Sequence, residues 1–96
     1  MSFVLGGLNS VKGVLNTDLD NATEPGFYSG WSTFTNTAFG SWTGILTLLV
    51  VKRQSGAFTQ IHFANIASRF YICVREYNPD GFTDWFSVEL PVVSAT

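Results

Sequence analysis

The sequence has 96 residues, of which 46% are hydrophobic, 16% are aromatic and only 12% are charged. This length fits one domain with a single modest core and excludes two cores, and the high apolar content argues against an intrinsically disordered chain. The net charge is −2 and the five basic residues form no run longer than two, so the chain lacks the basic stripe of proteins that bind nucleic acid.

Cysteine and histidine usage excludes two further kinds of site. Cys73 is the only cysteine and His62 the only histidine, so neither an intrachain disulfide nor a cysteine-based zinc site can form. Residues 1–7 lack the positive start and long apolar core of a signal peptide, and no apolar run approaches the roughly 20 residues of a transmembrane helix. We therefore expect no cofactor, no metal, no membrane insertion, and synthesis in a cytoplasm.

The N-terminal part of the chain is expected to form an arm that leads into the fold. Residues 1–17 are polar and rich in turn-forming residues, and their glycines each cost about 1 kcal/mol relative to alanine in a helix interior. The arm is expected to enter the domain near Asp18–Leu19–Asp20. Pro25–Gly26 is a strong turn signal, and Phe27–Tyr28 opens a first short strand.

Residues 29–44 are rich in Ser, Thr and Gly and carry several aromatic rings, which predicts a long loop. Such rings either pack against one another or are exposed for recognition, because aromatic faces anchor ligands and protein interfaces. Both interpretations stay open for four candidate ligand-binding rings: Trp31, Phe34, Phe39 and Trp42. Four other rings lie on or beside expected strands, where packing in the core is favoured: Phe27, Phe63, Phe70 and Trp85.

The run from Ile45 to Val51 predicts a strand that is apolar on both faces. It is rich in β-branched residues and shows no alternation of apolar and polar side chains. Such a strand is expected to be covered on both sides, by a second layer or by a neighbouring subunit. Two alternating sets are candidates for a subunit interface, and the sequence does not choose between them: Leu46, Leu48 and Val50, or Ile45, Leu49 and Val51.

The rest of the chain alternates between extended stretches and turns. Turn signals lie at 54–57, 65–68 and 78–81, and they separate extended stretches at 58–63, 69–76 and 82–90. In the first of these stretches, Thr59, Ile61 and Phe63 share one face and Phe58, Gln60 and His62 share the other. Four or five short strands joined by hairpins predict a small all-β, antiparallel, β-sandwich-like domain over residues 18–90, followed by a tail at 91–96.

No group of residues matches a catalytic arrangement. His62 lies mid-strand and the sequence has no Gly-x-Ser-x-Gly motif, so a structural role is favoured over that of a catalytic base. Asp80 and Asp84 are the only suggestion of a glycosidase pair, but acids beside a turn are usually solvated. Cys73 lies between apolar neighbours, which favours a buried, unreactive thiol. We expect no enzymatic activity.

Several ordered segments together resemble the knob-type domain of bacteriophage tail fibres and R-type pyocin fibres. The segments are Asp18-Leu19-Asp20, Pro25-Gly26-Phe27-Tyr28, Gly44-Ile45-Leu46-Thr47-Leu48, Thr59-Gln60-Ile61, Tyr71-Ile72-Cys73-Val74-Arg75 and Gly81-Phe82-Thr83-Asp84-Trp85. The resemblance spans residues 18–90. It departs from the family pattern in the last segment, where Phe82 and Trp85 occupy the positions of two tryptophans.

The resemblance implies a virion appendage: a homotrimeric β domain in a tail fibre, beside other fibre domains, that takes part in attachment to the bacterial surface. The expected ligand is a surface glycan bound by the four loop rings. A rival hypothesis keeps the fold and the trimer but assigns the domain to a structural spacer without a ligand. A third, a small glycan-cleaving enzyme, is disfavoured because no carboxylate pair stands out.

Overall fold

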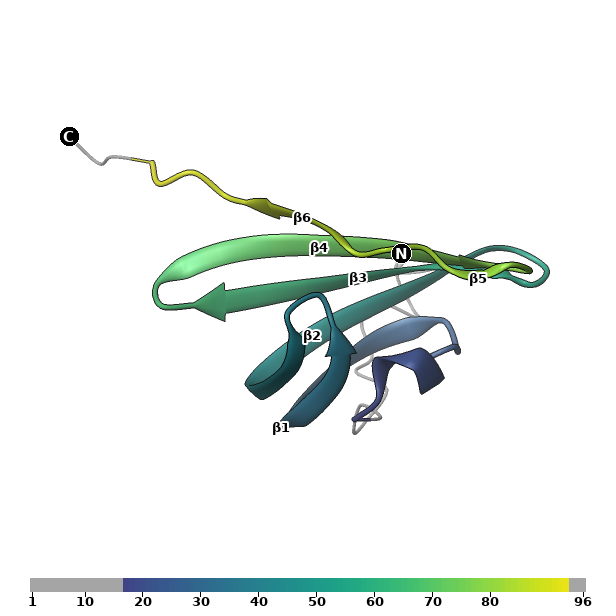
Figure 1. Ribbon diagram of the computed structural model, residues 1–96, viewed down its shortest axis with the longest axis horizontal. Coiled ribbons are helices and arrows are strands. Elements are labelled where there is room, and N and C mark those ends of the chain that lie inside the picture. The colour runs from purple at the N-terminus through teal and green to yellow at the C-terminus, as the bar shows by residue number, and fades with distance from the viewer. Residues whose placement is uncertain (1–16, 94–96) are drawn as a thin grey trace, which may run out of the picture.

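The structure, a computed structural model, describes residues 17–93, and within that range the strands form one antiparallel sheet (Figure 1). Strands β1 to β4 follow one another as a meander, and β5 and β6 both pair with β4. The strands are β1 (Gly26–Thr37), β2 (Gly40–Gln54), β3 (Ala57–Ile66), β4 (Arg69–Asn78), β5 (Gly81–Phe82) and β6 (Phe86–Glu89). The all-β antiparallel class predicted from the sequence is confirmed.

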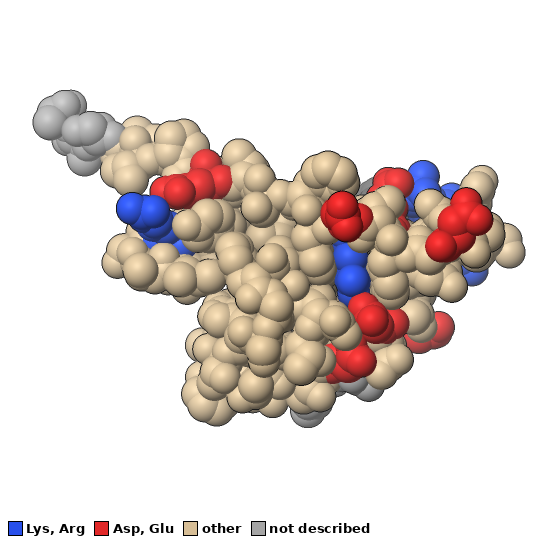
Figure 2. Space-filling view, viewed as in Figure 1, with Lys and Arg blue, Asp and Glu red and all other residues tan. Residues whose placement is uncertain are grey.

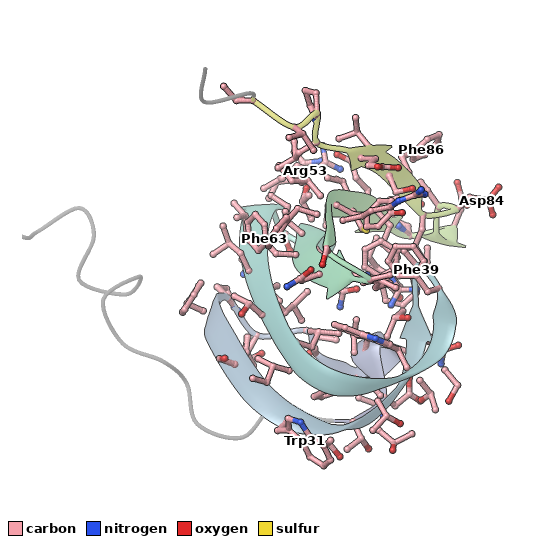
Figure 3. The ribbon with its side chains drawn as sticks, turned by 90° about the vertical axis from the view of Figure 1, so that its left-hand side faces the viewer. Trp31, Phe39, Arg53, Phe63, Asp84 and Phe86 are labelled. Carbon is pink, nitrogen blue, oxygen red and sulfur yellow. The ribbon has the colours of Figure 1, made fainter. Side chains whose placement is uncertain are left out.

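The sandwich-like packing arises because this single sheet curls over itself (Figure 3). The tip of the β1–β2 hairpin reaches the other end of the meander, where the Phe39 ring lies 5.3 Å from that of Tyr71. The Trp85 indole closes the curl by donating a 3.1 Å hydrogen bond to the Asn36 carbonyl. The apolar core fills the inside of the curl and contains Leu19, Ala22, Phe34, Leu46, Leu48, Val50 and Phe58.

The prediction of a long loop over residues 29–44 is wrong. Both arms of this segment are strands, paired from Gly26↔Val50 to Phe34↔Trp42, with a bulge before the turn. Ser, Thr and aromatic residues are interspersed there, and Thr and aromatic side chains fit a pleated surface. Gly40 has a φ of +79°, a conformation that glycine adopts at no steric cost, and it lets the chain reverse beside Thr37.

The segment 45–51 is extended, as predicted, in the middle of a longer β2. Leu46, Leu48 and Val50 point into the core and are almost completely buried. Ile45 and Val51 point the other way and are 66% and 41% exposed. Within residues 17–93 no second layer covers this outward side, because the one sheet curls toward one side only. Coverage by a neighbouring subunit, the other alternative, stays a prediction.

The predicted turns after β2 and after β4 are confirmed, with β2 ending at Gln54 and β5 beginning at Gly81. The final extended stretch is divided, because residues 83–85 leave the ladder between β5 and β6. The expected entry point is a short 3₁₀ turn, η1 (Leu19–Asn21), in which the Asp18 carboxylate accepts a hydrogen bond from the Asp20 backbone N–H. The predicted arm lies outside the described residues except for Thr17.

Candidate functional site

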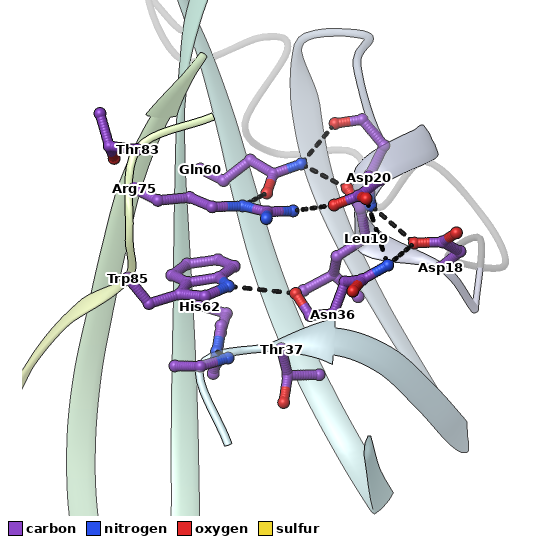
Figure 4. A network of polar contacts seen from close by, with 12 residues as sticks. Asp18, Leu19, Asp20, Asn36, Thr37, Gln60, His62, Arg75, Thr83 and Trp85 are labelled. Atoms are coloured by element: carbon purple, nitrogen blue, oxygen red, sulfur yellow. Dashed lines mark hydrogen bonds and ion pairs between the residues drawn. The ribbon is translucent and has the colours of Figure 1, made fainter. Parts of the chain in front are cut away.

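A polar network occupies the inner face of the sheet (Figure 4). Arg75 on β4 is 5% exposed, and it donates to Gln60 Oε1 at 2.8 Å and to Asp20 Oδ1 at 3.0 Å. Gln60 in turn donates to the carbonyls of Leu19 and Ala22 at 2.7 and 2.9 Å. The network thus ties η1 to the centre of β3 and β4.

Two aromatic rings enclose the Arg75 guanidinium. Its Cζ atom lies 3.7 Å from the centroid of the Phe82 ring and 4.5 Å from that of Trp85, within the range of a cation–π contact. Burial lowers the Arg75 pKa, and the hydrogen bond and charge of Asp20 oppose that effect. The hydrogen bond from Asn36 lowers the pKa of Asp18. The donors and acceptors named here are occupied within the chain, so the network acts in folding.

His62 lies beside this network and is completely buried. Its Nε2 atom accepts a 3.1 Å hydrogen bond from the Ala38 backbone at the β1–β2 turn, so the ring is neutral with its proton on Nδ1. Burial, with the nearby Arg75 charge, lowers the His62 pKa to about 4. Cys73, opposite His62 in the ladder, is also buried, and burial raises its thiol pKa to about 11. Neither side chain is open to a ligand.

The carboxylates considered for glycan cleavage do not form an enclosed pair. Asp80 and Asp84 are both exposed, near the end of the sheet that carries β5. Among residues 17–93 no three His, Cys, Asp or Glu side chains are placed to hold a metal ion. The helix within that range is three residues long, and none there could cross a membrane.

The four candidate ligand-binding rings are divided between different surroundings. Phe34 is 1% exposed in the core, and Trp42, its cross-strand partner, packs half-buried against the same core. Phe39 is 38% exposed and contacts the rings of Tyr71 and His62. Trp31 is 71% exposed and points away from the curl (Figure 3). The structure does not gather these rings into one patch, because neighbouring positions in a strand point to opposite faces.

The largest unexplained surface is the outside of the sheet. Register partners share a face, so the outward positions of the strands can be read across the ladders. We call the following set the apolar outer face: Phe27, Ser29, Trp31, Ile45, Thr47, Leu49, Ile61, Phe63, Asn65, Phe70, Ile72, Val74, Phe86 and Val88. None of these residues is charged, but Glu76 also points outward, opposite Thr59, at the border of the set. Charged side chains are visible in the view of Figure 2, gathered toward the two ends and along one line across it.

Three rings on this face were predicted to lie in the core: Phe27, Phe63 and Phe70. Phe27 is half-buried. Phe63 is 41% exposed and Phe70 is 55% exposed, because both side chains point outward from their strands. The alternation in β3 was the available signal: Phe63 shares its face with Ile61, whereas Gln60 and His62 share the other. Sequence reasoning placed Phe63 in the core, but Gln60 and His62 are inside, hydrogen-bonded through the Gln60 amide and the His62 Nε2 atom.

A groove of about 440 Å³ lies within the apolar outer face. Strands β2, β3 and β4 form its floor, and the chain leaving β6 forms one wall. Its lining includes Ile45, Thr47, Phe63, Phe70, Ile72 and Leu90. The polar groups at the groove are few, among them the Thr47 hydroxyl and the Asn65 amide. The arrangement suits an apolar side chain with a single polar atom.

No family model, curated protein or solved structure matches the chain in the three comparisons that were made.

Proposed function

We propose that the chain is an assembly domain of a bacteriophage tail fibre, in which three copies associate through the apolar outer face and the fibre takes part in attachment to the bacterial surface. The observation that carries this proposal is the apolar outer face, whose residues are uncharged and of which several are largely exposed. Its polar counterpart, the Arg75 network, is buried inside the curl. A face of this composition favours contact with protein over contact with water.

The exposed area supports a protein interface. A fully accessible aromatic side chain contributes roughly 150–250 Å², so Trp31, Phe63, Phe70 and Phe86, exposed by 71%, 41%, 55% and 68%, offer roughly 350–600 Å². Ile45 and Val88, exposed by 66% and 55%, add to this sum, which compares with the roughly 800 Å² that each partner buries in a stable complex. The area is spread around the outside of the curl and is not one flat patch, since Trp31 and Phe86 lie on opposite sides of it (Figure 3).

Attachment to a surface glycan is the second part of this proposal. Of the four rings considered for it, Trp31 and Phe39 remain accessible. The Phe39 ring stands beside Tyr71, so these two aromatic faces form the better candidate for stacking on a sugar. Adsorption of the assembled protein to whole bacteria tests this part, and we expect Phe39→Ala to reduce it without a change in oligomeric mass.

The alternative of a structural spacer without a ligand has its own support. Two of the four rings, Phe34 and Trp42, are used in the core and are not available to a sugar. The spacer and the attachment domain share the interface and differ in binding to cells. An assembled protein that does not adsorb to any tested bacterium would favour the spacer.

Sedimentation velocity over a micromolar concentration series tests the assembly directly. The expected result is a species with the mass of three chains. Ile45→Lys, on the apolar outer face, is expected to reduce that species, whereas Val92→Lys, on the 92% exposed tail, is the matched control and is expected to leave it unchanged. A stable monomer throughout the series would overturn the proposal.

A further inference from the structure

The apolar outer face carries a projection and a hollow side by side. Trp31 on β1 is the most exposed ring of the sheet, and its cross-strand partner is Ile45. Ile45 in turn lines the groove of about 440 Å³. The Trp31 ring does not occupy the groove of its own chain, because 71% of it is exposed and it is absent from the lining.

We propose that Trp31 of one copy inserts into this groove on the neighbouring copy, and that this contact anchors the assembly. The inference rests on the proposed function, since it takes a second copy of the chain as the occupant. The contact joins two different patches, so it passes from each copy to the next and closes into a ring if the rotation allows.

The chemistry of the two patches is complementary. The groove presents aromatic and aliphatic side chains and no charge, which suits the indole ring. A buried indole N–H usually finds an acceptor, and the Thr47 hydroxyl and the Asn65 amide oxygen are acceptors in the groove lining. The volume falls in the range of about 300–1,000 Å³ that is typical of ligand pockets, so it admits an indole ring with a neighbouring side chain.

Two ion pairs border the apolar outer face. The ion pair between Arg69 and Glu89, 3.8 Å apart, lies at the end of β4 near the groove, and that between Arg53 and Glu76, 3.5 Å apart, lies at the opposite end. Both are half-exposed and lie outside the apolar outer face. An apolar centre within a polar rim is the usual anatomy of an interface whose central tryptophan carries much of the affinity.

Two single variants test the projection and the hollow separately. Trp31→Ala removes the ring, and Thr47→Lys places a charge in the groove. Each is expected to weaken self-association at least about thirtyfold in sedimentation equilibrium, which corresponds to the 2 kcal/mol of a hot-spot residue. Thr59→Lys is the matched control, because Thr59 is a half-buried outward threonine outside the groove, opposite Glu76. It is expected to change association less than threefold.

A mixture of the two variants provides the decisive measurement. The Thr47→Lys chain keeps its Trp31, and the Trp31→Ala chain keeps its groove, so one intact contact forms between them. We expect each variant alone to sediment as a monomer and the mixture to give a one-to-one pair. General stickiness of an apolar surface does not produce this complementation. Matching unfolding midpoints for the wild type and the variants establish that all chains are folded.

The failures of this inference and of the proposed function are distinguishable. One outcome is that the wild type assembles while Trp31→Ala weakens self-association less than threefold, and another is that it assembles while the mixture of variants gives no pair. Either result overturns the insertion of Trp31 and leaves the assembly domain intact. Loss of bacterial adsorption in Trp31→Ala at unchanged oligomeric mass assigns the ring to a ligand and also overturns the insertion. A wild-type monomer at every concentration overturns both proposals.

Discussion

The two faces of this sheet depart from the usual distribution of side chains, because buried polar groups lie beside the apolar core on the inner face and large apolar groups are exposed on the outer face. The inner face buries an arginine, a glutamine and a histidine, whereas the outer face exposes phenylalanine, tryptophan and isoleucine. On the inside, Arg75 and Gln60 satisfy each other and the carbonyls of η1. Burial of a polar group is costly only when its hydrogen bonds are lost. The inner face is therefore specified by hydrogen bonding as well as by apolar packing, and the outer face remains available for a partner.

Adjacent leucines on β2 give the sharpest test of this difference, and the largest expected effect. Leu48 is fully buried, so Leu48→Ala is expected to lower the free energy of unfolding by about 2–5 kcal/mol through lost contacts and a cavity. Leu49 is half-buried on the outer face, and Leu49→Ala is expected to cost about 1 kcal/mol. Urea unfolding at a concentration where the chain is monomeric measures both. Equal losses would mean that the two faces are equally buried in the monomer.

Acid is expected to lower the free energy of unfolding through a group on the inner face, His62. His62 is neutral when folded with a pKa of about 4, while an unfolded histidine has its ordinary value near 6.5. Between these values the unfolded chain binds the proton, so stability is complete above pH 6.5 and falls as the pH drops toward 4. The shift corresponds to about 3 kcal/mol.

Proton NMR can follow this titration without ambiguity, because His62 is the only histidine. Unfolding measured from pH 7 to pH 4 is expected to show the loss in the wild type and a flatter profile in His62→Leu. The pKa of Asp18 is lowered from its ordinary value by the hydrogen bond from Asn36, so its contribution to stability is lost mainly at the acid end of this window and below it. A His62 ring that titrates near pH 6.5 in the folded protein would contradict the burial of its imidazole.

A third prediction compares two arginines. Arg75→Met removes the donors to Gln60 and Asp20 and the contact with two rings, and is expected to cost about 2 kcal/mol. Arg53 pairs with Glu76 at 3.5 Å on the surface, and Arg53→Met is expected to change stability by less than about 1 kcal/mol. Thermal unfolding of the two variants at neutral pH measures the difference. A loss in Arg53→Met as large as that in Arg75→Met would show that burial does not set the strength of these contacts.

The smallest effect on folding is expected at the outer edge of the sheet. Phe86 is 68% exposed on β6, so Phe86→Ser is expected to change the free energy of unfolding by less than about 0.5 kcal/mol in the monomer. The same variant is expected to weaken self-association, because it removes apolar area from the outer face. Comparison of unfolding and sedimentation for this variant separates the two roles. A destabilised monomer would mean that Phe86 belongs to the fold.

The amino-acid sequence alone determined the local features of this protein. The Gly56 and Pro79–Asp80 turns and the alternation in β3 and β4 predicted the hairpins and the all-β class, because these signals act between near neighbours. The strand over 45–51 was predicted for the same reason. The arms of the β1–β2 hairpin were missed, because Ser, Thr and Gly are typical of loops and the pairing to β2 is required to identify them.

Tertiary structure decided which face is inside and how the candidate rings are distributed. An alternating strand has two faces, and hydrophobicity alone assigns the apolar one to the core. In β3 that assignment is wrong, since Gln60 and His62 find partners in η1 and in the β1–β2 turn, distant in the sequence. Those partners exist only once the sheet has curled. The inward direction of the curl thus depends on hydrogen bonds that no local pattern contains.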